Sequence, residues 1–219
     1  MFLEQCYSRA GFVFASERRG AVPTVSEQKK MLRSQMKEIL RDYCAAEDFV
    51  QASANARRAV LESDAFARAD IVLGYLFHGN EADCTDVLYR ALAMGKAVGL
   101  PRVVPGTSDM DFYLLDGTLQ FGDQIECGAF GISEPVKSLD RFSVDGRLCG
   151  RNILMLVPGV AFTKDGKRLG RGKGFYDRYI ARLRETCASV TAAGFCFPCQ
   201  IVDDVPVDAF DARLDAVFR

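Results

Sequence analysis

The sequence predicts an α/β protein, a single three-layer α/β/α domain with a mostly parallel central sheet. Largely apolar runs at 71–75, 97–103 and 153–157 have the length of strands that are buried on both faces. Segments with apolar residues at helical spacing lie between them, and strands that alternate with helices favour a parallel sheet covered on both sides. The 219 residues also fall within the size of one domain.

The first helix is expected to begin at Thr24, because Thr24 and Glu27 are spaced as a capping box directly after Pro23. Apolar residues then recur at helical spacing from Leu32 to Tyr43. The other expected elements are helices over 47–69, 83–94 and 175–184, strands over 71–75, 97–103, 153–157 and 190–196, and a hairpin of 110–115 with 118–121 around 116–117.

Composition is that of an ordinary globular protein, with 49% hydrophobic residues, 26% charged residues and a net charge of −1. This charge argues against bulk electrostatic binding to nucleic acid or to a membrane surface. The apolar runs are far too short to span a bilayer, and the run at 10–15 is short for a signal peptide. We therefore expect a cytoplasmic monomer without nucleic-acid or membrane partners.

The eight cysteines are expected to be reduced thiols in a chain of this size. Cys196 and Cys199 form a C-x-x-C, which would suit a redox pair or half of a zinc site. The sequence has no second C-x-x-C, and His78 is its only histidine. We therefore expect both cysteines to act as small apolar residues at the end of a strand.

The most informative segment follows the apolar run 153–157. Three glycines, Gly170, Gly172 and Gly174, alternate there with two cations and lead into a predicted helix. Glycines of this kind at a helix N-terminus make a cradle for phosphate oxygens. The spacing matches neither a P-loop nor a dinucleotide fingerprint, whose third glycine would fall at Phe175. The residues alone also leave open a flexible basic surface loop.

The string over 157–179, VPGVAFTKDGKRLGRGKGFYDRY, resembles the signature of 5-formyltetrahydrofolate cyclo-ligases, also called methenyltetrahydrofolate synthetases. Three further segments agree in the same order. They are 29–33 with a K-x-x-x-R element, 130–135 with an F-G-I-x-E-P element, and 200–207 with the C-terminal segment.

This resemblance covers about residues 26–218 and implies a cyclo-ligase-like domain over 26–219 after an N-terminal extension over 1–25. The activity it implies is the ATP- and Mg²⁺-dependent conversion of 5-formyltetrahydrofolate to 5,10-methenyltetrahydrofolate, with release of ADP and phosphate. ATP would phosphorylate the formyl oxygen, N10 would attack the activated carbon, and phosphate would depart. The sequence offers no convincing Ser/His or Cys/His arrangement, which agrees with a reaction that needs no side-chain nucleophile.

For the nucleotide, the resemblance implies that cations of the first helix and the glycine-rich loop hold ATP. Arg171 and Lys173 would be the catalytic groups that neutralise charge on the transferred phosphoryl group. The implied ATP-binding residues are Lys29, Arg33, Arg168, Leu169, Gly170, Arg171, Gly172, Lys173, Gly174, Phe175 and Tyr176.

Lys29 and Arg33 belong to a stripe of four cations on one helix face, which continues with Lys37 and Arg41. A solvated basic face explains such a stripe without any ligand. The resemblance gives a nucleotide contact to the first two cations, and we expect Lys37 and Arg41 at the surface.

For the folate, the resemblance implies an acidic element after the strand 71–75, whose carboxylate would accept hydrogen bonds from the pterin. Asp83 is the better counterpart and Glu81 the second, although Asp83 alternatively caps the next helix. Cys84 stands where the family has threonine. Phe175 stands where relatives commonly carry tyrosine, so it can supply only packing. The implied folate-binding residues are Glu81, Asp83, Arg171, Gly172, Lys173, Gly174 and Phe175.

For Mg²⁺, the resemblance implies two acids, because this ion prefers a few carboxylates together with substrate phosphates and waters. Asp177 directly follows the glycine-rich loop, where its other reading is an acid that stabilises a helix N-terminus. Asp211 is the second acid, with Asp208 and Asp215 as rivals for that role.

Two other classes of function remain open from the sequence. One is a non-catalytic homologue that binds folate, nucleotide or RNA. The other is a phosphotransferase that acts on another small molecule through the same loop. The complete glycine-rich loop, together with Lys29, Arg33 and Asp177, favours a working enzyme.

Overall fold

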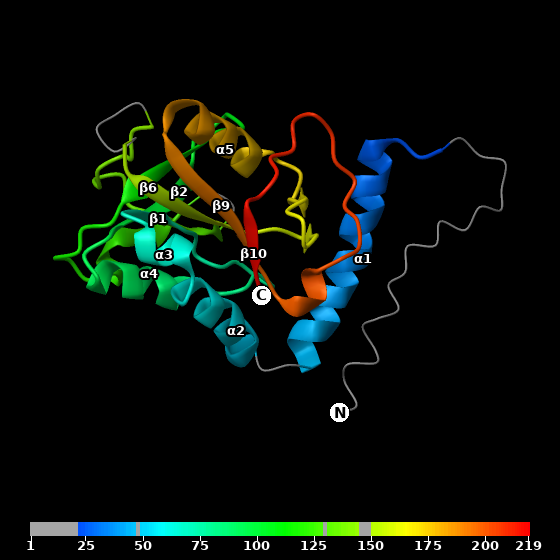
Figure 1. Cartoon of the computed structure of the whole chain (residues 1–219), viewed down its shortest axis with the longest axis horizontal. Coiled ribbons are helices and arrows are strands. Elements are labelled where there is room, and N and C mark those ends of the chain that lie inside the picture. The colour runs from blue at the N-terminus through cyan, green and yellow to red at the C-terminus, as the bar shows by residue number, and fades with distance from the viewer. Residues whose placement is uncertain (1–21, 47–48, 129–130, 145–149) are drawn as a thin grey trace.

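The computed structural model describes residues 22–46, 49–128, 131–144 and 150–219 and confirms a three-layer α/β domain (Figure 1). Its sheet has the order β10-β9-β6-β1-β2-β3, and all neighbours are parallel except β2 with β3. The strands are β1 Ile71–Leu73, β2 Ala97–Val103, β3 Met110–Leu114, β6 Asn152–Val157, β9 Ser189–Phe195 and β10 Ala216–Phe218. Two short hairpins stand beside it, β4 Ile125–Cys127 with β5 Ser133–Pro135 and β7 Ala161–Phe162 with β8 Arg168–Leu169.

The central strand β6 is apolar on both sides because helices cover both faces of the sheet. Leu154 and Leu156 pack in the cluster that contains α2, α3 and α4, whereas Met155 and Val157 pack with α5. All four are fully buried, and each such burial stabilises the fold by roughly 1.5–3 kcal/mol. The helices are α1 Val25–Ala46, α2 Phe49–Leu61, α3 Asp64–Arg68, α4 Thr85–Ala93 and α5 Phe175–Thr186.

Helix α1 begins with the predicted capping box. The backbone N–H of Thr24 donates to Glu27 Oε2 at 2.8 Å, and that of Glu27 donates to Thr24 Oγ1 at 3.3 Å. The buried side chains of Leu32 and Met36 pack with the β7–β8 hairpin and Val205. Helix α1 therefore lies beside the C-terminal segment and the hairpin that leads into the glycine-rich loop (Figure 1).

The predicted hairpin around 116–117 is wrong. Strand β3 pairs with β2, and 118–121 forms no strand. The Asp116 carboxylate accepts hydrogen bonds from the backbone N–H and the hydroxyl of Thr118, at 2.8 and 2.7 Å. This local turn leads toward a short 3-10 helix instead of a second strand.

Other differences from the predicted elements are local. The helix expected over 47–69 is divided into α2 and α3, because the Ser63 hydroxyl accepts the N–H of Phe66 and caps α3. The strands β7, β8 and β10 have two or three residues, too few to show a periodicity. Phe130 of the F-G-I-x-E-P element and residues 1–21 lie outside the described residues.

The sheet order creates a crevice for a ligand. From β1 the chain continues to β2 and β3 on one side, and from β6 it continues to β9 and β10 on the other. Ligands bind outside the carboxyl ends of strands at such a switch point. The loops 74–84 and 158–174, which follow β1 and β6, meet there.

Candidate functional site

A pocket of about 340 Å³ lies at this switch point, a volume within the range of small-molecule sites. Its walls come from the loops after β1 and β6, the first turn of α5, and the ends of β2, β3 and β5. Many of its lining residues fall into two groups, which we call the polar end and the apolar end after the side chains and the parts of the chain that supply them. The polar end contains Glu81, Arg168, Gly170, Arg171, Lys173, Gly174 and Asp177, and the apolar end contains Pro101, Val103, Met110 and Ile132.

The glycine-rich loop needs its glycines for two reasons. Gly172 and Gly174 have φ values of 97° and 68°, in the left-handed region that side chains disfavour. A Cβ atom at Gly170 would lie 2.8 Å from Arg168 Nη1, and one at Gly174 would lie 2.7 Å from Arg178 Nη1. The loop therefore turns sharply and lets two guanidinium groups approach its backbone.

Arg168 is a fixed cation in the pocket wall. Its side chain is 3% exposed, with Nη2 donating to Asp177 Oδ1 at 2.7 Å and Nη1 donating to the carbonyl of Pro158 at 3.1 Å. The guanidinium also lies over the ring of Tyr176, 5.8 Å from its centroid. Among the described residues, its Nε finds no acceptor. The N–H of Ala212 donates to the same Asp177 oxygen at 3.2 Å and ties the C-terminal segment to the site.

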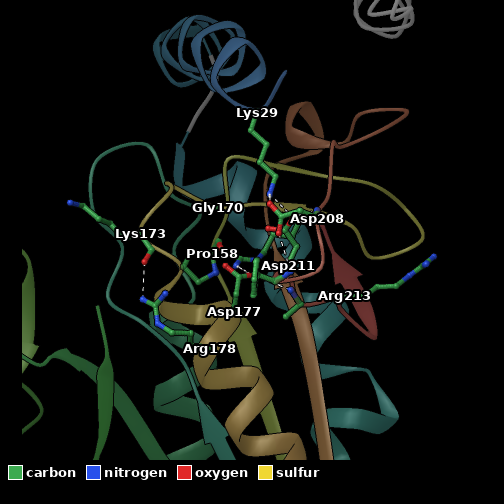
Figure 2. A network of polar contacts seen from close by, with 12 residues as sticks. Lys29, Pro158, Gly170, Lys173, Asp177, Arg178, Asp208, Asp211 and Arg213 are labelled. Carbon is green, nitrogen blue, oxygen red and sulfur yellow. Dashed lines mark hydrogen bonds and ion pairs between the residues drawn. The ribbon is translucent and has the colours of Figure 1, made fainter. Parts of the chain in front are cut away.

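Lys29 reaches from α1 to two acids of the C-terminal segment (Figure 2). Its Nζ lies 2.7 Å from Asp208 Oδ2 and 2.5 Å from Asp211 Oδ2, and the residue is 8% exposed. Burial by itself lowers the pKa of Lys29, but the hydrogen bonds and charges of both acids outweigh it and raise that pKa. The same contact lowers the pKa of Asp208. This predicted nucleotide-binding lysine is thus ion-paired within the protein.

The stripe of cations on α1 divides into two parts. Arg33 Nε donates to the carbonyl of Gly170 at 2.9 Å, so this side chain contacts the glycine-rich loop. Lys37 and Arg41 are exposed, and Arg41 pairs with the adjacent Asp42. The expected surface position of Lys37 and Arg41 is confirmed.

Arg171 bridges the glycine-rich loop to the loop after β1. Its Nη2 lies 2.9 Å from Glu81 Oε1 and donates to the carbonyl of His78 at 3.1 Å. Glu81 lines the pocket, whereas the Asp83 carboxylate accepts the N–H of Thr85 at 2.9 Å at the start of α4. The geometry therefore favours Glu81 over Asp83 as the acid that faces a ligand.

The remaining predicted residues fall into two groups. Lys173 and Phe175 line the pocket, and the Lys173 side chain extends away from the acids in Figure 2. Leu169 is buried in the cluster with α1, so its side chain serves the core.

Sequence reasoning assigned no role to the apolar end. Pro101 and Val103 come from β2 and Met110 from β3, while Ile132 and Glu134 belong to the F-G-I-x-E-P element. The F-G-I-x-E-P element was the one sequence signal for this wall, because it matched the family pattern but had been given no binding role. The pairing of β2 with β3 brings the first three residues together, and contacts between β2 and the β4–β5 hairpin bring the other two beside them.

The acids fit a magnesium ion that is held chiefly by substrate phosphates. No cluster of three or more His, Cys, Asp or Glu side chains able to hold a metal occurs in the part of the chain that the structure describes. Mg²⁺ needs no such cluster, because one or two carboxylates suffice beside phosphates and waters. Asp177 lines the pocket, and Ala212 links it to the neighbouring Asp211. Asp215 instead pairs with Arg184 at 2.7 Å.

In the C-x-x-C, Cys196 is buried and Cys199 is partly buried. Burial raises the pKa of Cys196 and that of Cys199 to about 12 each. The thiolate is the reactive form of cysteine, so both side chains are inert near neutral pH. Both are free thiols, as expected.

A doubly wound sheet with a glycine-rich, cationic loop at its switch point defines a protein that binds a phosphate-bearing ligand. Residues 25–219 match the model of the 5-formyltetrahydrofolate cyclo-ligase family. The chain therefore belongs to this family, and the resemblance seen in the sequence is confirmed.

Individual relatives agree with this assignment. A probable 5-formyltetrahydrofolate cyclo-ligase of Caenorhabditis elegans is 29% identical over 195 residues, which cover 88% of this chain and 93% of the relative. The 5-formyltetrahydrofolate cyclo-ligase of Escherichia coli K12 is 38% identical over 149 residues, 68% of this chain and 77% of the relative. The NMR structure of Aquifex aeolicus 5,10-methenyltetrahydrofolate synthetase has a TM-score of 0.68 and 26% identity, covering 87% of this chain and 88% of that one.

No helix among the described residues is both long enough and apolar enough to cross a bilayer.

Proposed function

We propose that this protein converts 5-formyltetrahydrofolate to 5,10-methenyltetrahydrofolate, using ATP and Mg²⁺ and releasing ADP and phosphate. Membership of the cyclo-ligase family supports the proposal. The observation that carries it is the composition of one pocket, where a cationic glycine-rich loop adjoins an apolar end. Such a pocket suits a triphosphate beside a ring system.

The reaction must activate a formamide oxygen, which is a poor leaving group. In the proposed first step this oxygen attacks the γ-phosphorus of ATP, the bond from that phosphorus to the bridging oxygen breaks, and ADP leaves. N10 then attacks the formyl carbon and loses its proton. The carbon–oxygen bond breaks, inorganic phosphate departs, and the five-membered ring is closed.

The protein's part is to position two substrates and neutralise charge on the moving phosphoryl group. We assign charge neutralisation to Arg171 and Lys173, with Arg168 and the loop N–H groups as further donors. Lys29 and Arg33 would hold the triphosphate from α1. The contact from Arg33 to the loop supports this, since it places the guanidinium at the phosphate cradle.

Glu81 is proposed to bind the amino-pyrimidine edge of the folate. Its position in the pocket wall supports this role, because a carboxylate accepts the hydrogen bonds that this edge donates. Asp83 stays the alternative, although its carboxylate already accepts the N–H of Thr85 at the start of α4.

Asp177 and Asp211 are proposed to hold Mg²⁺, which would supply positive charge to the phosphate oxygens when bound. The partly buried Asp177 carboxylate at the pocket wall supports the first assignment, and its link to the C-terminal segment supports the second. The ion pair between Lys29 and Asp211 must then open, so that Asp211 can bind the ion and Lys29 can bind the nucleotide.

We also propose a cytoplasmic monomer that has these two substrates as its partners and binds neither nucleic acid nor membrane. The net charge of −1 supports the latter part, because it gives no bulk attraction to phosphate-rich surfaces. Size-exclusion chromatography with light scattering tests the monomer, and a second copy in the particle would contradict it.

The discriminating experiment measures ADP release with ATP, Mg²⁺ and one acceptor at a time. We expect release with 5-formyltetrahydrofolate and none with unformylated tetrahydrofolate or with common hydroxylated metabolites. Release with a different acceptor would favour a phosphotransferase. Binding of folate or nucleotide without any release would favour a non-catalytic homologue.

A further inference from the structure

The hairpin β4–β5 forms one wall of the apolar end of the pocket. Ile132, Ser133 and Glu134 line the pocket there, and Glu134 lies beside the end of β2. The hairpin is a separate two-stranded sheet and shares no ladder with the main sheet. Backbone hydrogen bonds tie the segment after β5 to β3, and side-chain contacts join the hairpin itself to β2.

The hairpin carries an unfavourable pair of charges. Glu126 of β4 stands directly opposite Glu134 of β5 in the antiparallel register. Like charges in that arrangement destabilise a strand pair. Glu134 is also only 4% exposed, and a buried carboxylate is costly unless it is compensated. A side chain at Gly128 would collide with this carboxylate, so the backbone packs closely around it.

Arg102 of β2 compensates both acids. Its Nη1 lies 2.6 Å from Glu126 Oε1 and 2.6 Å from the carbonyl oxygen of Pro135, and its Nε lies 3.8 Å from Glu134 Oε2. The side chain is 12% exposed. The next residue, Val103, adds a backbone N–H to Glu134 Oε1 at 3.0 Å. One guanidinium thus joins β2 to both strands of the hairpin, with Nη1 making both short contacts and Nε facing the Glu134 carboxylate.

We infer that Arg102 is a positioning residue for the folate half of the pocket. It holds the hairpin so that Ile132 and Ser133 stay against the apolar end, where a pterin or benzoyl ring fits better than a triphosphate. The inference rests on the proposed function. The partners of Arg102 among the described residues lie in β4 and β5, whereas Arg168 and Arg171 pair with Asp177 and Glu81. Loss of Arg102 therefore weakens folate binding and leaves ATP binding intact.

Steady-state kinetics with each substrate varied in turn tests this division. Arg102→Met should raise the KM for 5-formyltetrahydrofolate about tenfold while the KM for ATP and kcat change less than about twofold. Arg102→Lys keeps the charge but places it on one nitrogen of a shorter side chain, so it should restore part of the affinity and leave a rise of about threefold. The melting temperature of each variant is measured alongside.

Arg141→Met is the matched control. Arg141 pairs with Asp111 at 3.2 Å on β3 and is 62% exposed, so this substitution removes the same charge near the same strands. Both KM values should stay at those of the wild type.

Equal rises in both KM values, or a fall in kcat alone, would overturn the inference. If Arg102→Met does not fold, Arg102→Lys decides, and a wild-type folate KM for that variant overturns the inference as well. A wild-type protein that forms no methenyltetrahydrofolate would overturn the proposed function, and this inference with it. If the wild type is active but Arg102→Met does not raise the KM for 5-formyltetrahydrofolate selectively, only the inference about Arg102 is contradicted and the proposed function stands.

Discussion

The two ends of the pocket are built in opposite ways. The polar end comes largely from one continuous stretch, the loop 168–174 and the first turn of α5. The apolar end comes from β2, β3 and β5, three elements that are joined by the sheet order and by Arg102. A binding site formed by one stretch of chain can be predicted from the sequence, whereas a site assembled from several elements can be recognised only once the fold is known.

The two ends also differ in the interactions that fix their side chains in place. Two cations of the polar end are paired with protein acids, Arg168 with Asp177 and Arg171 with Glu81. A ligand must compete with these pairs or use the donors that remain. The apolar end is held by packing and by the ion pairs of Arg102 with the half-exposed Glu126 and the buried Glu134. Substitutions at the two ends should therefore affect different kinetic constants.

The largest effect is expected at the polar end from Asp177→Asn. A neutral amide is a poor Mg²⁺ ligand, so turnover should fall by about two orders of magnitude or more. The isosteric amide keeps an acceptor for Arg168 and the N–H of Ala212, so the fold should persist. Turnover is measured over a range of Mg²⁺ concentrations with circular dichroism as the folding control. A wild-type rate throughout that range would remove Asp177 from the metal site.

The next effect separates the two parts of the cation stripe on α1. Lys29→Ala or Arg33→Ala should each cost about 1.5–3 kcal/mol, or roughly ten- to a hundredfold in the ATP dependence of turnover. Lys37→Ala removes the same charge from the same face and should change almost nothing, because Lys37 is solvated. The three variants are compared side by side. Small and equal changes would mean that the nucleotide is held without α1.

A smaller effect is expected at the apolar end from Val103→Thr. This substitution keeps the shape but places a hydroxyl against the folate ring, which should raise the KM for 5-formyltetrahydrofolate about fivefold. The KM for ATP should not change, because the glycine-rich loop is untouched. If the ATP constant rises instead, the substrates occupy the pocket in the reverse orientation.

The smallest effect is expected from deleting residues 1–21, which precede the matched family region. The deletion keeps Thr24 and Glu27, so the capping box of α1 is retained. Activity with both substrates and the melting temperature should stay near the wild-type values. A rise in either KM would show that the extension contributes to that end of the pocket.

Most residues of the polar end could be identified from the sequence. The alternating glycines, the capping box and the buried strands are local patterns, and the structure places them as the patterns predict. The apolar end could not be predicted from the sequence, because Val103 and Ile132 lie far apart in the chain and neither forms part of a local pattern that indicates a binding site. Which of Glu81 and Asp83 lines the pocket likewise depends on where the loop after β1 turns. The predicted hairpin of 110–115 with 118–121 was wrong because β3 pairs with β2 instead.

The most direct test of the central claim is the formation of product. The protein is mixed with ATP, Mg²⁺ and 5-formyltetrahydrofolate, and the characteristic absorbance of 5,10-methenyltetrahydrofolate is followed. We expect that absorbance to grow in step with ADP release, at one product for each ADP, and only when all three components are present. ADP release without this absorbance, or no reaction in the complete mixture, would contradict the assignment of the pocket to both substrates.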